Sequence, residues 1–186
     1  MSVLPRLAIA ALMIAASPVA LAESFEDDAT GLAVDASDAW TGARAEDDGA
    51  DAMFGFTARS GTPPIAGNSG YLCAVNFTAA PQNGDLSQAE INEMIISDNW
   101  QEMSRSILSQ VMIIDTAEPF MRDGVRGFEF TATPRVGPDA QAVRLYLTML
   151  ETPKGRTAQS CATTRDAFET ALPMFRELRD GTTPPK

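Results

Sequence analysis

The sequence predicts an α+β domain, in which an antiparallel β-sheet is packed against helices. Apolar residues recur with a period of two in several short segments bounded by Gly, Pro, Asn and Asp, which is typical of β-strands. Residues 88–109 and the stretch that begins at Arg165 instead have apolar residues at the helical period. Because the later strands follow one another through tight turns, we expect antiparallel pairing with the helices outside the sheet.

Residues 1–22 have the order of a secretory signal peptide. Arg6 is the single charge of this segment, an apolar stretch follows over residues 7–16, and Ala20 and Ala22 supply the small-x-small pattern of a cleavage site. The apolar stretch is about 10 residues long, too short for a bilayer core that needs about 20. We therefore expect cleavage between Ala22 and Glu23, no stable membrane insertion afterwards, and one periplasmic or secreted domain over residues 23–186.

The early strands are short and separated by polar segments. Residues 23–30 are polar, and we expect them to be frayed. Residues 31–35 form a short strand candidate, and the alternating apolar residues of 52–58 form a better one. Glycines and prolines make residues 61–70 a loop, after which alternation resumes in a strand over 71–78.

Two helices are predicted next. Ser87 and Glu90 have the spacing of a capping box, which marks a helix start. The apolar residues that follow fall on two nearly opposite faces: Ile91, Met94 and Ile95 on one, and Ile96, Trp100, Met103 and Ile107 on the other. A single straight helix cannot bury both faces on one core, so we place a break at Ser97 and predict helices over 88–96 and 98–109.

Two β-hairpins are predicted after the helices. The first pairs residues 111–117 with 125–132 through an Asp-Gly turn at 122–124, a strong hairpin signal. The second pairs residues 140–151 with 156–163.

A closing helix begins near Arg165, and its spacing turns four residues inward: Phe168, Leu172, Phe175 and Leu178. Pro173 lies inside this pattern, so we expect the helix to kink or restart there. Residues from about 180 to 186 are rich in Thr and Pro and are expected to form a loose tail.

The two cysteines, Cys73 and Cys161, both lie in segments with strand character. An exported protein with an even number of cysteines favours a structural disulfide. Two buried thiols and a redox pair are the alternatives, although the chain has no C-x-x-C motif. A bridge would require the strand around Cys73 to lie beside the strand around Cys161.

The charge balance excludes nucleic-acid binding. The chain has 14 Lys and Arg against 25 Asp and Glu, and loss of Arg6 with the signal peptide leaves 13 against 25, a formal net charge of −12. Nucleic-acid phosphates require clustered basic residues instead. Nine acidic residues gather early in the chain, and we interpret them as solvated turns because no calcium-loop pattern is present: Glu26, Asp27, Asp28, Asp35, Asp38, Glu46, Asp47, Asp48 and Asp51.

Histidine is absent from the whole sequence. This removes the commonest general base, the usual transition-metal ligand and every Ser-His-Asp or Cys-His nucleophile system. We therefore expect no catalytic residues, no metal and no cofactor, and we predict that the protein is not an enzyme.

The order of elements, together with certain residues, resembles the PsbP-like family. The matching pieces are Trp40 after an early strand, the hairpin segment 123–130, and residues 146–162 followed by a helix with Pro173. The stretch 71–134 is also similar to a group of short exported alphaproteobacterial proteins of unassigned role. The resemblance implies an α/β/α sandwich, with the antiparallel sheet between helices, and a binding or accessory role rather than catalysis.

Three residues are candidates for ligand or partner contact: Arg126, Arg144 and Trp100. With two other strand arginines, Arg126 and Arg144 could form a small anion pocket; the alternative is ordinary strand charges paired with Glu129 and Glu151. Trp100, with Met94 and Met103, could line an apolar groove; the alternative is packing between helix and sheet.

These observations favour a non-catalytic extracytoplasmic binding or accessory module that acts through protein–protein contacts in the cell envelope. The alternative function is a carrier of a small apolar ligand in a pocket between sheet and helices. The partner is then an envelope protein or a small molecule. A pocket of roughly 300 Å3 or more is the feature that the carrier requires.

Overall fold

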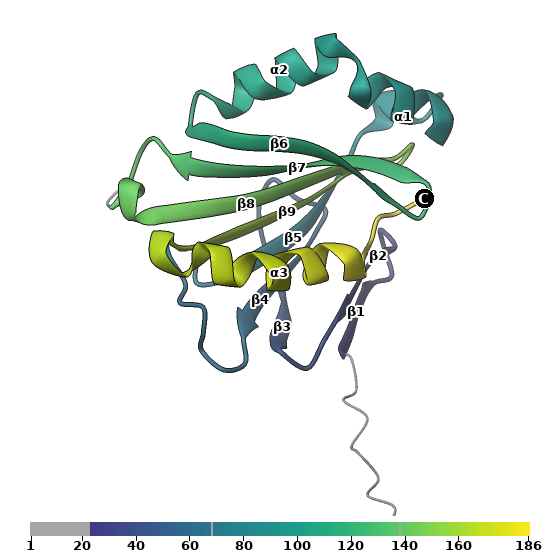
Figure 1. Cartoon of the computed structure of the whole chain (residues 1–186). Helices are drawn as coiled ribbons and strands as arrows, with labels where there is room; N and C mark the ends of the chain where they lie inside the picture. Colours follow the sequence, from purple (N-terminus) through teal and green to yellow (C-terminus); the bar gives the residue numbers. More distant parts are fainter. Residues whose placement is uncertain (1–22, 68, 138) are drawn as a thin grey trace, which may run out of the picture.

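A computed structural model describes residues 23–67, 69–137 and 139–186, and Figure 1 shows their arrangement. The expected signal peptide, including Ala22 at its cleavage point, lies outside the described residues. The central feature is a seven-stranded antiparallel sheet with the strand order β3-β4-β5-β9-β8-β7-β6. A smaller sheet with the order β1-β2-β10 lies beside α3.

The strands have the following bounds: β1 (Glu23–Asp27), β2 (Leu32–Ala36), β3 (Trp40–Ala45), β4 (Ala52–Ala58), β5 (Cys73–Ala79), β6 (Met112–Arg122), β7 (Val125–Pro134), β8 (Val143–Glu151), β9 (Gly155–Thr164) and β10 (Thr182–Thr183). The α-helices are α1 (Gln88–Ile96), α2 (Asp98–Leu108) and α3 (Arg165–Gly181), with short 3-10 turns at Pro81–Asn83 and Ala140–Ala142.

The predicted helix pair and the first predicted hairpin are both present. Ser87 and Glu90 form the complete capping box at the start of α1. The Ser97 side chain accepts a hydrogen bond from the Trp100 backbone N–H and so caps α2. The helix is therefore interrupted at Ser97, where the predicted apolar face switches from one side to the other. Asp123 and Gly124 turn between β6 and β7 with φ values of 48° and 83°. Positive φ at both positions suits the right-handed twist of the hairpin.

The polar N-terminal segment is not frayed, which corrects the sequence prediction. Residues of β1 pair with β2 along their whole length, with Phe25 opposite Val34. The Phe25 ring packs against Phe56 with ring centroids 5.2 Å apart. A single apolar residue among acidic neighbours thus helps to dock this strand, because the core supplies an aromatic partner that the local sequence does not show.

The C-terminal helix and tail correct two further predictions. Helix α3 runs unbroken through Pro173, because Phe168, Phe175 and Leu178 are buried on both sides of the proline. The tail is not loose: Thr182 lies opposite Val34 in the small sheet and is itself buried. The hydroxyl of Thr182 also donates to the Leu178 carbonyl at 2.9 Å.

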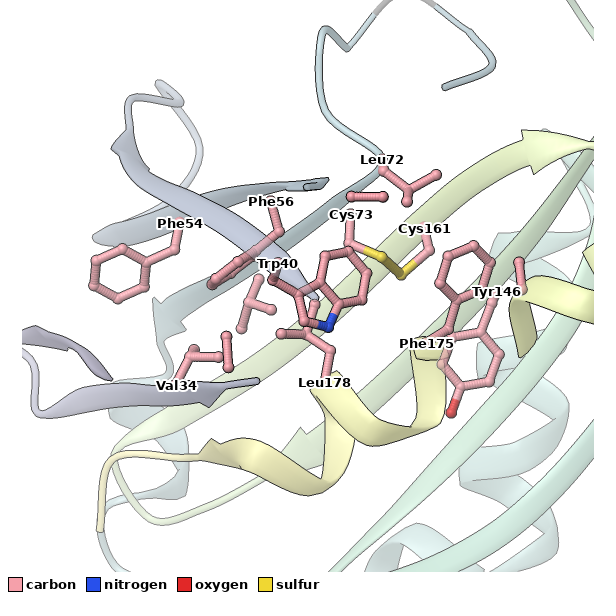
Figure 2. Close-up of a cluster of buried hydrophobic side chains, with 14 of the residues drawn as sticks. Val34, Trp40, Phe54, Phe56, Leu72, Cys73, Tyr146, Cys161, Phe175 and Leu178 are labelled. Atoms are coloured by element: carbon pink, nitrogen blue, oxygen red, sulfur yellow. A yellow bond between two sulfur atoms is a disulfide. The ribbon is translucent and has the colours of Figure 1, made fainter. Parts of the chain in front are cut away.

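Helix α3 and the small sheet cover one face of the large sheet, where the larger hydrophobic core lies (Figure 2). Its fully buried side chains come from both halves of the chain and include Trp40, Phe56, Leu72, Tyr146, Phe175 and Leu178. The Tyr146 ring stacks on Phe175 of α3 with centroids 6.1 Å apart. This core therefore covers one face of the large sheet.

Helices α1 and α2 cover only part of the opposite face. Their buried residues Ile91, Ile95 and Trp100 pack on Phe128 and Phe130 of β7, next to side chains of β6 and β8. On the same face of the neighbouring strands, Thr78 of β5 and Ser160 of β9 are exposed. Among the helices of the described residues, none combines the length and the apolar character that a membrane span needs.

Candidate binding surface

A hollow of about 360 Å3 lies where α1 and α2 meet the half-covered face of the large sheet. Helix residues form one side, and the ends of β5, β8 and β9 with the loop after β5 form the other. Its lining residues are Thr78, Ala79, Ala80, Gln82, Asn83, Met94, Trp100, Met103, Glu151 and Arg156. We call this feature the hollow below.

The helical side of the hollow is apolar. Trp100 is 5 % exposed, and its ring stacks on Phe128 with centroids 5.7 Å apart. Met103 is 50 % exposed, and Ile107, one helical turn further along α2, is 59 % exposed. The sequence predicts one stripe containing all three, but α2 turns Trp100, Ser104 and Leu108 toward the sheet. Met103 and Ile107 are therefore left at the edge of the helix, beside the open sheet face.

The strand side of the hollow is polar and already paired. The Glu151 carboxylate is buried, and the Arg156 Nε lies 2.5 Å from its Oε1. The Asn83 amide contacts Glu151 Oε2 at 3.5 Å and donates to the Thr152 carbonyl at 3.2 Å. The carboxylate is thus already engaged in an ion pair. Within the described residues no three His, Cys, Asp or Glu side chains gather to hold a metal ion.

The open sheet face continues from the hollow as a trough. Its floor consists of small side chains that alternate along β5 and β9: Ala74, Asn76, Ala158 and Ser160. On its far side the Tyr71 ring lies directly on Gly55 of β4, where any Cβ would collide with it. The trough is thus walled by α2 on one side and by Tyr71 on the other.

Comparisons with known proteins identify the fold. No protein-family model and no curated protein matches the sequence. Among solved structures, the solution structure of cyanobacterial PsbP, CyanoP from Synechocystis sp. PCC 6803, superposes with a TM-score of 0.54 at 12% sequence identity, covering 92% of this chain and 98% of that chain. The chain has the PsbP-like fold.

A Pseudomonas aeruginosa protein of unknown function superposes with a TM-score of 0.44 at 11% identity, covering 88% of this chain and 96% of that one, which is too low a likeness to support a conclusion. The PsbP-like fold confirms the predicted α+β class, with the antiparallel sheet between α3 and the α1–α2 pair. At such low identity the likeness extends to the fold and not to residue roles.

The PsbP-like fold separates the two arginines that the sequence analysis grouped. Arg126 lies two residues before Phe128 and so belongs to the α1–α2 face, where its backbone N–H donates to Asn92 Oδ1 at 2.9 Å. Arg144 lies two residues before Tyr146 on the α3 face and donates to Asp115 Oδ2 at 2.8 Å. A shared anion pocket of Arg126 and Arg144 is therefore wrong. Trp100 is the one member of the predicted set that lines the hollow.

A buried ion cluster, which sequence reasoning missed, attaches α3 to the sheet. Glu129 of β7 accepts hydrogen bonds from the Tyr146 hydroxyl at 2.8 Å and the Arg176 Nε at 3.1 Å, and it also pairs with Arg179. The Arg179 guanidinium lies 4.8 Å from the centroid of the Phe120 ring. The sequence signal for this cluster is limited to two arginines three positions apart on either side of the inward-facing Leu178.

The contacts within this cluster shift the pKa values of Glu129 and Tyr146. Burial by itself would raise the pKa of the Glu129 carboxyl, but the hydrogen bonds from Arg176 and Tyr146 and the two positive charges outweigh burial, so its pKa lies below the usual value. Burial raises the pKa of the Tyr146 phenol, and its bond to the Glu129 carboxylate adds to that rise. Glu129 therefore stays ionised and the phenol stays protonated at neutral pH.

The predicted disulfide is confirmed. Cys73 and Cys161 lie opposite each other in β5 and β9, with Cα atoms 4.0 Å apart, and each is 1 % exposed. The strand around Cys73 is thus the neighbour of the strand around Cys161, as the bridge requires. The sulfur atoms lie in the core under α3, on the sheet face opposite the hollow (Figure 2).

Proposed function

We propose that this protein is a non-catalytic accessory module outside the cytoplasm, which binds a partner protein of the cell envelope along the trough and the hollow. The observation that carries this proposal is the pair Met103 and Ile107. Both side chains are at least half exposed, they lie one turn apart on α2, and they border a sheet face that no helix of the described residues covers. Apolar side chains gathered beside an open surface are typical of contact sites.

Two features support a role outside the cytoplasm. The Cys73–Cys161 disulfide belongs to oxidising compartments. Residues 1–22 have the pattern of a cleaved export signal. Mass spectrometry of protein recovered from the periplasm or medium is expected to find Glu23 at the N-terminus. Recovery of the chain from the cytoplasm with Met1 to Ala22 retained would overturn this part of the proposal.

Two features support a non-catalytic role. The sequence contains no histidine, and the carboxylate in the hollow, Glu151, is paired with Arg156 and Asn83. The other side chains that line the hollow are apolar, amide or threonine groups. Such a lining holds a ligand by packing and hydrogen bonds and offers no activated nucleophile.

Site-specific photocrosslinking in the intact envelope tests the contact surface. A photoreactive residue at position 107 is expected to give a discrete crosslinked species, because this side chain borders the trough. The matched control is position 169, where Glu169 is exposed on the outer side of α3. Equal crosslinking at both positions, or none at 107, would contradict the proposed surface.

The second candidate function is the carrier of a small apolar ligand, which the volume of the hollow favours. About 360 Å3 lies just above the lower end, about 300 Å3, of typical ligand pockets. The half-exposed Met103 at its edge makes the hollow an open depression rather than an enclosed cavity, so protein contact is the better-supported function. Saturable binding of one apolar dye per chain, lost in Met103→Lys, would instead favour the carrier.

A further inference from the structure

We propose that the partner segment is a basic amphipathic helix, which lies along the trough and places an apolar side chain in the hollow. This inference rests on the proposed function and names the chemistry of its partner. Three features carry it: the shape of the trough, the apolar edge of α2, and the charges around both.

The shape of the trough suits a helix. From β4, on which the Tyr71 ring lies, across β5 and β9 to β8 there are three strand spacings of about 4.8 Å, or about 14 Å in all. An α-helix with its side chains is about 10–12 Å across. A helix on a sheet face is also the ordinary way to complete a layered domain, and α1 and α2 leave this part of the sheet without one. An added strand would need a free edge, whereas β5 and β9 are paired on both sides.

The edge of α2 supplies the apolar contact. Met103 and Ile107 lie at positions i and i+4 and so form one continuous strip. Trp100 and Met94 extend this strip into the hollow. Thioether and indole groups fill irregular gaps and are enriched at contact sites, so an inserted leucine or methionine side chain of the partner would find matching surface.

The charge around the trough is acidic. The loop between β3 and β4 lies against the hollow, because Asp51 accepts from the Ala79 backbone N–H at 2.7 Å and the Gly49 carbonyl accepts from the Thr78 hydroxyl at 3.2 Å. This loop carries three further exposed acids, Glu46, Asp47 and Asp48. Glu90 lies one turn before Met94 on α1 and is also exposed. Arg156, which lines the hollow, is paired with Glu151. The exposed Lys154 also lies beside the hollow, since its carbonyl accepts from the Ala80 backbone N–H at 3.0 Å, but the exposed acids outnumber it.

This acidic border selects among possible occupants. Lysine and arginine side chains of a partner would pair with it, and opposite charges speed and orient encounter. A second copy of the exported domain, residues 23–186, would bring 13 basic against 25 acidic residues, a net charge of −12, to the same border. The surface therefore fits a basic helix better than a self-contact.

The test uses two designed peptides of about 18 residues, about five helical turns. One carries leucines on one face and lysines on the other, and the second has glutamates in place of the lysines. Labelled peptide is titrated with the exported domain, residues 23–186, and fluorescence anisotropy is recorded. We expect the lysine peptide to bind at least roughly tenfold more tightly than the glutamate peptide, with an affinity that falls as salt rises.

Variants then locate the binding on the surface. Met103→Ser with Ile107→Ser is expected to weaken lysine-peptide binding about tenfold or more, whereas Met121→Ser, at an equally exposed apolar residue of β6, leaves it unchanged. Glu46→Lys with Asp48→Lys should weaken binding as well. The control with the same charge change is Glu169→Lys with Glu177→Lys, on the outer side of α3.

Four results would overturn this inference. Equal affinity for both peptides would show that the acidic border does not select a basic partner. Lysine-peptide binding that is unchanged in Met103→Ser with Ile107→Ser would show that the peptide binds at another surface. Self-association of the domain that is lost in that same double variant would identify a second copy as the occupant. Crosslinking at position 107 to a protein without a basic helix would refute the partner chemistry and leave the proposed contact surface intact, so the two proposals fail separately.

Discussion

At the level of single residues, Glu129 determines how α3 sits on the sheet. Its carboxylate is buried in β7, and the two arginines that reach it both come from α3. The Arg179 side chain is 14 % exposed and the Arg176 side chain 41 %. Removing either partner of a buried ion pair lowers the free energy of unfolding, because the remaining charge stays buried without a counter-charge.

The substitution Glu129→Gln is therefore expected to lower the free energy of unfolding by about 2–4 kcal/mol, less than for a fully buried pair because Arg176 reaches water. Urea denaturation at neutral pH measures the loss. Because the folded-state pKa of Glu129 lies below the usual 4.5, its contribution is present above that pH and is lost as the pH falls through the folded pKa. Glu169→Gln, at an exposed residue on the outer side of α3, is the control and should change stability by no more than about 0.5 kcal/mol.

Asp27 has a similar role at the turn between β1 and β2. Its Oδ1 accepts from the Thr30 backbone N–H at 2.8 Å and from the Thr30 hydroxyl at 2.7 Å, while Oδ2 pairs with Arg44. These contacts, with the Thr30 hydroxyl first and Arg44 next, lower the pKa of the Asp27 carboxyl from 3.8 to about 2.

We expect Asp27→Asn to destabilise the protein by about 1–2 kcal/mol at pH 7, because hydrogen bonds to a charged group are lost. A depressed folded-state pKa stabilises above the unfolded value, so the difference from wild type should be constant above about pH 5 and shrink as the pH falls toward 2. Thermal melts over this range measure the difference. Asp28→Asn removes the same charge at an exposed neighbour, and a pH-dependent loss there would refute the assignment.

Among the elements, α3 continues as one helix through a proline at which the sequence predicts a kink or a restart. A proline inside a helix lacks the backbone N–H that would bond four residues back, and its ring crowds the preceding turn. Pro173 itself is exposed, whereas the inward residues on either side of it are packed in the core. The packing of the helix face therefore outweighs the local preference of the chain.

This reasoning predicts that Pro173→Ala stabilises the protein, by about 1–3 kcal/mol, because a helical hydrogen bond becomes available and only part of the gain is offset by a more flexible unfolded chain. Chemical denaturation measures the change. Pro153→Ala, in the turn between β8 and β9, should have the opposite sign, since no helical bond is restored there. A loss of stability in Pro173→Ala would mean that the proline shapes α3 in a way the core needs.

The edge strand β6 shows how the sheet avoids unwanted pairing. It contains Pro119, its pairing with β7 shifts register between Ile114 and Thr116, and the exposed Asp115 and Glu118 add charge. Prolines, bulges and charges on an edge discourage the addition of another strand. The edge strand β6 is therefore poorly suited to the addition of another strand.

Over the whole molecule, the Cys73–Cys161 bridge joins the two halves of the large sheet. It links β5 to β9 at the centre of the strand order, across a sequence separation of 88 residues. Strands that come before the helix pair are thereby tied to strands that come after it.

The double substitution Cys73→Ser with Cys161→Ser is therefore expected to lower stability by about 3–5 kcal/mol, since closing a loop of this length restricts the unfolded chain strongly. The denaturant midpoint should fall, and peptide mapping without reductant should find both cysteines of the native protein in one linked peptide pair. Two alkylatable thiols in the native protein, or an unchanged midpoint in the double variant, would contradict this prediction.

Several elements could be predicted because their signals are local. The strand over 52–58, the helix pair broken at Ser97 and the Asp-Gly turn at 123 and 124 each depend on residues a few positions apart. Strand β3 was missed, since it lies at the sheet edge with a pattern of small and exposed residues. Local periodicity cannot indicate a strand whose only apolar anchor, Trp40, is buried by distant partners.

The candidate site was predicted only in part, for a related reason. The sequence indicated that Trp100, Met94 and Met103 could line one groove, and helix spacing relates Trp100 to Met103 directly. It could not relate Glu151 and Arg156 to them, nor separate Arg126 from Arg144, because strand order and register decide which side chains share a face. The same limit hid the cluster around Glu129, whose partners are 47 and 50 residues away.

Composition and short-range patterns thus determine the α+β class, the cysteine pair, the acidic charge and the absence of a histidine-based active site. These properties depend on residue identity and on spacings within one element. The register of seven strands, the continuous α3, the docked C-terminal tail and the open trough beside α2 became evident in the tertiary structure alone. Each depends on which distant apolar and charged groups meet in the core, and the burial free energy of those contacts exceeds the local preferences that a sequence displays.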